Sequence, residues 1–193
     1  MPAAPTTVVF DLGGVLVDWD PRHLYRQLFD DEAEMEAFLA EVTTLEWNAH
    51  QDAGRPFAEA IEALAAEHPE RRELIEAFHR RWPEMLAGEV PGTVAVLAEL
   101  RAAGVRLLAL SNWSSETFPV ARERFPFLAW FEEILISGDV GVNKPDRRIF
   151  EHLVDRFALD PAATVFVDDS AANVEAAAAL GFRALRFADA ASL

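Results

Sequence analysis

The sequence contains no cysteine, a single lysine and no apolar segment long enough to cross a bilayer. The lack of cysteine excludes disulfide bonds and zinc–thiolate sites. The opening segment MPAAPTT has neither the basic region nor the apolar region of a secretory signal peptide. We therefore expect a cytoplasmic protein.

Positive charge is scarce, because 17 basic residues face 33 acidic ones and the formal net charge is -16. A field of this sign repels nucleic acids and anionic membrane surfaces, so we expect neither as a partner. It also repels phosphate esters, so a phosphate site needs a metal ion or local positive charge. The single lysine, Lys144, is a candidate for a role that the planar guanidinium of arginine cannot fill. The alternative, a lysine that persists on the surface by chance, stays open.

The pattern of apolar residues divides the chain into two kinds of segment. A short β-branched and aromatic run at 7–10 predicts a buried strand, and residues 21–82 then read as consecutive helices. From residue 91 onward, helices alternate with short apolar strands, which is typical of a parallel sheet covered on both faces. We expect an α/β core, Rossmann-like in its sheet, formed by 1–18 and 89–193, with an all-helical cap inserted at 19–88.

Polar residues follow the predicted strands where the strands end. Asp11 follows the first strand, Ser111 and Asn112 the second, and Asp168 and Asp169 the fourth. The lone lysine lies in the loop after the third strand. Ligands of open parallel sheets bind at the carboxyl ends of the strands, so these groups converge on one rim. The set suits Mg2+ and a phosphoryl group, although each residue alone is equally typical of a turn or a helix cap.

Four segments, FDLGGVL, LLALSNW, VNKPDRRIF and TVFVDDSAANVEAA, occur in this order. They resemble the four motifs of the haloacid dehalogenase-like hydrolase superfamily, and the resemblance covers essentially the whole chain. It is nearest to the branch of small sugar phosphatases that includes α-D-glucose-1-phosphatase. The resemblance implies a Mg2+-dependent phosphatase that acts on a small phosphorylated metabolite, a sugar phosphate in this branch. We expect a monomer or homodimer, between which the sequence does not decide.

The resemblance also assigns roles to the strand-end residues. Asp11 is the nucleophile that becomes an aspartyl-phosphate, in agreement with the chemistry of carboxylate nucleophiles. Ser111 and Asn112 hold the phosphoryl oxygens, and Lys144 neutralises Asp11 and the incoming phosphate.

The resemblance likewise implies a metal site. Asp169 is the main carboxylate ligand of Mg2+ beside Asp11 and the backbone carbonyl of Gly13. Asp168 acts directly or through water. Asn173 stands where many relatives have an acidic residue, so we expect it to support the ligands from behind.

The predicted cap contains the segment WNAHQDAGRPF, in which Trp47, His50, Asp52 and Arg55 cluster around the break at Gly54. Caps of this kind exclude water and contact the part of the substrate that is not phosphate. We expect Trp47, His50 and Arg55 to influence substrate specificity. Ordinary packing of a tryptophan and a histidine inside a helical bundle is the alternative.

Gly13 departs from the usual pattern, because most phosphatases of the superfamily have a second aspartate two residues after the nucleophile. That residue protonates the leaving oxygen, and such help accelerates a reaction by a factor of about 10²–10⁴. Three explanations stay open. The substrate has a good leaving group, another residue (His50, Asp18 or Asp20) supplies the proton, or the enzyme is a 2-haloacid dehalogenase, whose halide leaves without a proton.

A hypothesis of another class is a binding protein with weakened catalysis. The presence of Asp11, Lys144, Asp168 and Asp169 argues against complete loss of activity, and the Asp168-Asp169 pair favours metal-dependent phosphate chemistry over halide displacement. We therefore expect a hydrolase.

Overall fold

The structure, a computed structural model, describes residues 6–193. Its main sheet has five parallel strands in the order β5-β4-β1-β6-β7. The strands are β1 (Thr7–Phe10), β4 (Arg106–Ser111), β5 (Glu133–Ile136), β6 (Thr164–Asp168) and β7 (Arg183–Arg186). The predicted α/β architecture is confirmed, and β1 lies in the centre of the sheet.

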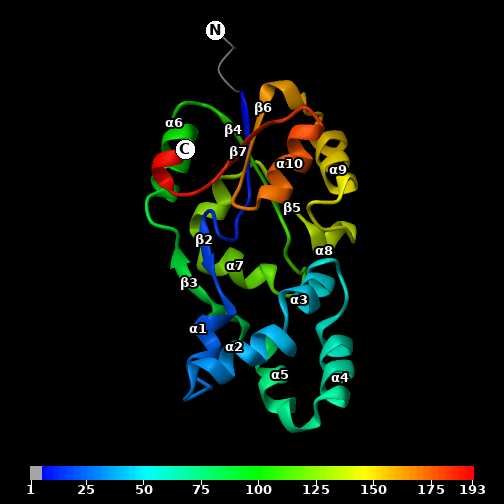
Figure 1. Cartoon of the computed structure of the whole chain (residues 1–193). Coiled ribbons are helices and arrows are strands. Elements are labelled where there is room, and N and C mark those ends of the chain that lie inside the picture. The colour runs from blue at the N-terminus through cyan, green and yellow to red at the C-terminus, as the bar shows by residue number, and fades with distance from the viewer. Residues whose placement is uncertain (1–5) are drawn as a thin grey trace.

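Both faces of this sheet are buried under helices. Along β1, Val8 and Phe10 pack on one face and Val9 on the other, as the alternation of side chains in a strand requires. On the Val9 face, α9 and α10 supply the apolar cover; on the opposite face, α6 and α7 do. Figure 1 shows α6 on one side of the sheet and α9 and α10 on the other. These helices span Thr93–Ala102 (α6), Phe118–Arg124 (α7), Ser137–Val140 (α8), Arg147–Phe157 (α9) and Ala171–Ala179 (α10).

Five further helices lie together at one end of the molecule (Figure 1). They are α1 (Pro21–Tyr25), α2 (Glu32–Glu41), α3 (Leu45–Asp52), α4 (Phe57–Glu67) and α5 (Arg72–Arg80). Side-chain caps start the first three: Asp20 accepts the N–H of Arg22 at 2.8 Å, and Asp31 and Thr44 act in the same way. We call these five helices the cap helices.

A two-stranded antiparallel ribbon, β2 (Val17–Trp19) with β3 (Leu86–Glu89), joins the cap helices to the sheet. It is not predictable from the sequence, because strands of three and four residues carry too little alternation to be distinguished from helix ends. The ribbon lies at both ends of the predicted insertion 19–88, so the division into two domains stays a prediction.

Within the predicted helical segment 21–82, the first helix is short and ends at Tyr25. Single 3-10 turns stand on either side of α5. The 3-10 segments are Pro69–Arg71, Trp82–Met85, Pro126–Trp130, Pro161–Ala163 and Ala190–Ser192. Proline opens four of these five segments or stands second in them, where its missing N–H costs nothing. Within residues 6–193, no helix combines the length and apolarity that a bilayer crossing requires.

Candidate active site

Three neighbouring strands deliver polar side chains to one rim of the sheet. Asp11 follows β1, Ser111 ends β4 and Asp168 ends β6. The register places Phe10 beside both Ala109 and Val167, so the three strand ends stand side by side. The convergence expected from the sequence is therefore present in the structure.

Lys144 connects the strand ends. Its Nζ lies 2.9 Å from Asp11 Oδ1, 2.7 Å from Asp168 Oδ2 and 2.9 Å from the carbonyl oxygen of Leu110. Three acceptors thus surround an ammonium group that has three protons, and the side chain is 1% exposed. Burial lowers the pKa of Lys144, but the carboxylates of Asp11 and Asp168 outweigh burial and raise it. Lys144 is therefore charged.

Asp11 is held in one orientation by converging donors. Its Oδ1 accepts hydrogen bonds from Ser111 Oγ at 2.9 Å and from the N–H of Leu12 at 2.7 Å, in addition to the contact with Lys144. Burial raises the pKa of Asp11, while the ammonium of Lys144 opposes this shift. A fixed, buried carboxylate beside an ammonium fits the role of nucleophile, because it is poorly hydrated and already oriented.

Asp168 is fully buried, and donors occupy both of its oxygens. Oδ1 accepts from the N–H of Ser170 at 2.9 Å and from Asn173 Nδ2 at 3.0 Å, and Oδ2 accepts from Lys144 Nζ. Asn173 Nδ2 also lies 3.1 Å from Oδ2. Asn173 therefore supports Asp168 from behind, and Asp168 in turn positions the lysine.

A third carboxylate completes a group that could hold a metal ion. One ligand oxygen from each of Asp11, Asp168 and Asp169 lies within 4.8 Å of the others. Mg2+ binds oxygen ligands at about 2.0–2.1 Å, so opposed ligands stand about 4 Å apart, and the donor set is the hard oxygen set that this ion prefers. Because Asp168 already accepts from three donors, Asp11 and the exposed Asp169 are the better ligands.

Gly14 makes room for Asp169. A Cβ at Gly14 would stand 2.5 Å from Asp169 Oδ2, a distance that forces one of the two to move. The φ angle of Gly14 is +75°, which also favours glycine. The glycine after Gly13 therefore lets the loop after β1 close around the carboxylate group.

The side chain of Asn112 binds the backbone of the lysine loop. Its Oδ1 accepts the N–H of Lys144 at 2.8 Å, and its Nδ2 donates to the Lys144 carbonyl at 3.0 Å. This pair of hydrogen bonds fixes the start of the Lys144 side chain. Contact of Asn112 with phosphoryl oxygens stays a prediction.

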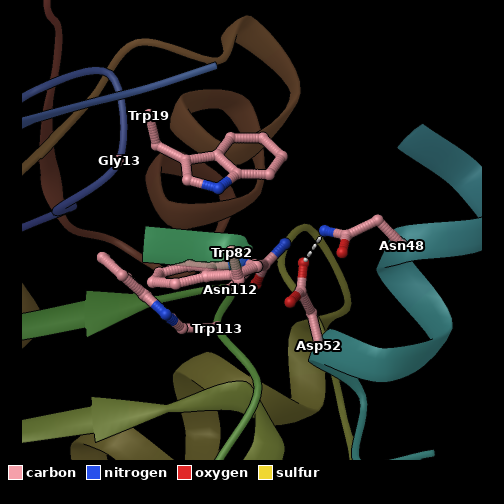
Figure 2. Close-up of a pocket in the computed structure, with 7 residues that line it drawn as sticks. All are labelled: Gly13, Trp19, Asn48, Asp52, Trp82, Asn112 and Trp113. Atoms are coloured by element: carbon pink, nitrogen blue, oxygen red, sulfur yellow. Dashed lines mark hydrogen bonds between the residues drawn. The ribbon is translucent and has the colours of Figure 1, made fainter. Parts of the chain in front are cut away.

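A small cavity of about 50 Å³ adjoins the rim, between the sheet and the cap helices. Figure 2 shows the seven residues that line it: Gly13, Trp19, Asn48, Asp52, Trp82, Asn112 and Trp113. Three polar atoms on its lining side chains are buried without a hydrogen-bond partner in the described chain: Trp19 Nε1, Trp113 Nε1 and Asn48 Oδ1. Buried polar groups are normally paired, so two donors and one acceptor are left for a bound molecule.

Of the three predicted specificity residues, Trp47 and His50 lie on α3, and Arg55 lies in the loop before α4. Trp47 packs edge to face on Phe78, with ring centroids 5.1 Å apart, and His50 is exposed. Neither they nor Arg55 are among the described residues that line the cavity. Their influence on specificity stays a prediction.

Asn48 and Asp52, from the same segment, do line the cavity. Asp52 belongs to the cluster already noted in the sequence, whereas Asn48 was not singled out there, although a signal existed. Residues four apart share a face of a helix, and Asn48 donates to Asp52 Oδ2 at 2.8 Å.

A family model described as haloacid dehalogenase-like hydrolase matches residues 5–181 of the chain. The chain belongs to the haloacid dehalogenase-like hydrolase family. It is 26% identical over 181 residues to the sesquiterpene phosphatase astK of Aspergillus oryzae, an alignment that covers 94% of this chain and 89% of that protein. It is 28% identical over 116 residues to (S)-2-haloacid dehalogenase 1 of a Pseudomonas species, of whose length the chain spans about half, 48%.

Among solved structures, the fold matches a haloacid dehalogenase family enzyme of Bacteroides thetaiotaomicron, crystallised with magnesium and inorganic phosphate. The TM-score is 0.75 at 22% identity, with 96% of each chain covered. This likeness shows that the two chains share a fold. The narrower resemblance to α-D-glucose-1-phosphatase stays a prediction.

Proposed function

We propose that this hydrolase is a Mg2+-dependent phosphatase that acts on a small phosphate ester, a sugar phosphate in the branch that its motifs resemble, through an aspartyl-phosphate on Asp11. The observation that carries the proposal is the charge of the rim. Asp11, Asp168 and Asp169 contribute three negative charges and Lys144 one positive charge, which leaves a net charge of -2. This net charge repels an anionic substrate until a cation binds.

The carboxylates supply the ligands for that cation. Asp11 and Asp169 would hold Mg2+, with the backbone carbonyl of Gly13 and with Asp168 directly or through water. When bound, the ion neutralises charge on the phosphoryl oxygens and helps to align them with the nucleophile.

The residues of the chain then perform the displacement. Ser111 and Leu12 hold Asp11 Oδ1, which fixes the carboxylate for in-line attack on phosphorus. Lys144 carries a permanent positive charge against Asp11 and against the incoming phosphoryl group. When substrate binds, Ser111 Oγ would turn its proton from Asp11 to a phosphoryl oxygen, and Asn112 Nδ2 would use the proton that it does not donate to the Lys144 carbonyl.

Dehalogenation is the second candidate, because haloacid dehalogenases are among the relatives of the chain. The rim argues against it. Displacement of halide needs no metal ion, and three clustered carboxylates would repel a haloacid anion if no cation were bound.

The test is a panel of phosphate esters assayed for phosphate release with Mg2+ and with EDTA. We expect release that requires Mg2+ and that is abolished in Asp11→Asn, because an amide neither attacks phosphorus nor offers an anionic ligand. Chloride release from 2-chloropropionate in EDTA, without activity on any ester, would overturn the proposal. Binding of Mg2+ and a phosphate analogue without turnover would instead support a protein with weakened catalysis.

A further inference from the structure

The loop after β1 leaves open space where related phosphatases have an acid. A Cβ built on Gly13 meets no atom within 4 Å, and Gly13 is not among the glycines with a positive φ angle. Gly13 also lines the cavity. The space that a side chain at position 13 would occupy is therefore open to a group from another residue.

Helix α3 brings a carboxyl group to that space. Two hydrogen bonds fasten its last turn to the core: Ser137 Oγ donates to the carbonyl of Asp52 at 2.5 Å, and Asn143 Nδ2 donates to the carbonyl of Ala49 at 2.6 Å. The backbones approach closely at this point, since a Cβ at Gly54 would stand 3.3 Å from the carbonyl oxygen of Gly138. These contacts fix the position of Asp52 relative to the core.

Asp52 is the one ionisable side chain among the seven described residues that line the cavity. Figure 2 shows its carboxyl group and the amide of Asn48 on the α3 side, with Gly13 and Trp19 on the other. The groups that face Asp52 are uncharged: the Asn48 amide on α3, the N–H of Ser114 in the loop after β4, and the indoles of the lining tryptophans. The charged side chain of α8, Asp139, is bound to Ser115 instead.

This environment favours the protonated acid. Burial raises the pKa of Asp52 to about 7, against the opposing effect of the N–H of Ser114. A general acid works best when its pKa lies near the working pH. Asp52 therefore retains a transferable proton near neutral pH.

The other candidates for the missing acid are engaged elsewhere. Asp18 pairs with His23, whose Nε2 lies 3.0 Å from Asp18 Oδ1. Asp20 caps α1 through the N–H of Arg22. His50 is exposed on α3 and does not line the cavity. None of these three residues lines the cavity beside Gly13, whereas Asp52 does.

We infer that Asp52 is the general acid and base of this enzyme and that the cap helices supply the group that related phosphatases have at the position of Gly13. The inference rests on the proposed function. In the first half-reaction, Asp11 forms a bond to phosphorus, the ester P–O bond breaks, and the leaving oxygen takes the proton of Asp52. The products are an alcohol, the aspartyl-phosphate and the Asp52 carboxylate.

In the second half-reaction, a water molecule attacks phosphorus and gives a proton to the Asp52 carboxylate. The bond between phosphorus and Asp11 breaks, which releases inorganic phosphate and restores both aspartates to their starting states. Each turnover thus returns the proton that it used, and no other reactant is required.

The test measures the rate of enzyme phosphorylation in single turnovers, with Mg2+, for a series of esters from dinitrophenyl to alkyl phosphates. In Asp52→Asn, we expect the alkyl esters to slow by about 10²–10⁴-fold and the dinitrophenyl ester to change by less than about threefold, because protonation matters most for the most basic leaving oxygen. The matched control is Glu46→Gln, which makes the same carboxylate-to-amide change at an exposed site of α3.

Rescue separates catalysis from structure. Gly13→Asp in the Asp52→Asn background should restore much of the alkyl ester rate, since the structure has room for a side chain there. In the wild-type protein, the alkyl ester rate should fall as pH rises through about 7, where Asp52 loses its proton. The dinitrophenyl rate should show no such fall.

The outcomes distinguish the two proposals. Equal slowing of all esters in Asp52→Asn, with phosphorylation of Asp11 retained, would overturn the role of Asp52 and leave the phosphatase intact. No release of phosphate from any ester by the wild-type protein would overturn the proposed function itself.

Discussion

On the sheet side of the cavity, Asp11 and Asp168 share the ammonium group of Lys144, whereas on the cap side Asp52 faces only amide, N–H and indole groups. Asp11 and Asp168, at the rim beside the cavity, are the same acidic residue type as Asp52, which lines it. Their surroundings differ in one respect, the presence of a buried positive charge. On the sheet side this charge opposes the effect of burial, and on the cap side nothing of comparable strength does.

The difference gives two carboxyl groups two roles at one pH. A carboxylate beside an ammonium is available as a nucleophile, and a half-buried carboxyl group without a charged partner retains a proton to donate. An enzyme with a separate acid position in the loop after β1 does not need this contrast. With glycine at position 13, the contrast between sheet and cap replaces it.

The largest effect is expected from replacing Lys144, whose ammonium group Asp11 and Asp168 share. Lys144→Arg should reduce single-turnover phosphorylation at least about 10²-fold, because a planar guanidinium cannot meet three acceptors around one point. Overpacking of the buried site should also lower the free energy of unfolding by about 1–3 kcal/mol.

Rapid-quench kinetics and urea denaturation measure the two effects. The control is Arg147→Lys, which exchanges the same residue types in an exposed pair with Glu151 and should change neither quantity. Near-normal turnover of Lys144→Arg would make the single lysine of the chain a coincidence.

The next substitution separates an effect on Mg2+ binding from an effect on the stability of the fold. Gly14→Ala places a Cβ against Asp169 and should weaken Mg2+ binding at least about tenfold, or roughly 1.4 kcal/mol. Gly104→Ala is a matched control, because its φ angle is +76° and its Cβ meets nothing within 4 Å. Both variants should lose about 1–2 kcal/mol of stability through backbone strain.

Isothermal titration with Mg2+ shows whether backbone strain alone or the contact between the new Cβ and Asp169 weakens binding. If the two alanine variants bind Mg2+ equally well, Asp169 is not a ligand whose position depends on Gly14. A selective loss in Gly14→Ala would locate the ion beside Asp169.

The sheet side was predictable from the sequence, and the cap side was not. Each short apolar run ends in the polar residue that it delivers, and parallel pairing brings these ends together without further information. Asp11, Ser111 and Asp168 follow from that rule. Lys144 was found because it is the only lysine in the sequence.

The face of α3 that meets the core depends on distant residues. Its docking uses Ser137 and Asn143, which are 85 and 94 residues away from their partners in the sequence. The local pattern contains Trp47, Asn48, His50 and Asp52 without indicating which of them turn inward. The segment was therefore predictable from the sequence, whereas the choice of Asn48 and Asp52 as the residues that line the cavity was not.

The smallest expected effect tests the cap side without any substrate. The pKa of Asp52 is raised from 3.8 to about 7 in the folded protein, so the unfolded chain loses this proton first as pH rises. The folded state therefore loses stability relative to the unfolded state between about pH 4 and pH 7, and the deficit stays constant above that range.

Asp52→Asn removes the charge and keeps the shape of the side chain. As pH rises across the same range, the variant should therefore become more stable than the wild-type protein. A shift of about three pKa units corresponds to at most roughly 4 kcal/mol, and screening by water in the cavity reduces it, so we expect a gain of about 1 kcal/mol at pH 8 and none at pH 4. Urea denaturation of both proteins in EDTA at a series of pH values measures the difference, with Glu46→Gln as the control. A gain that does not vary with pH would mean that the pKa of Asp52 is not raised in the folded protein, and the contrast between Asp52 and the carboxylates beside Lys144 would then be wrong.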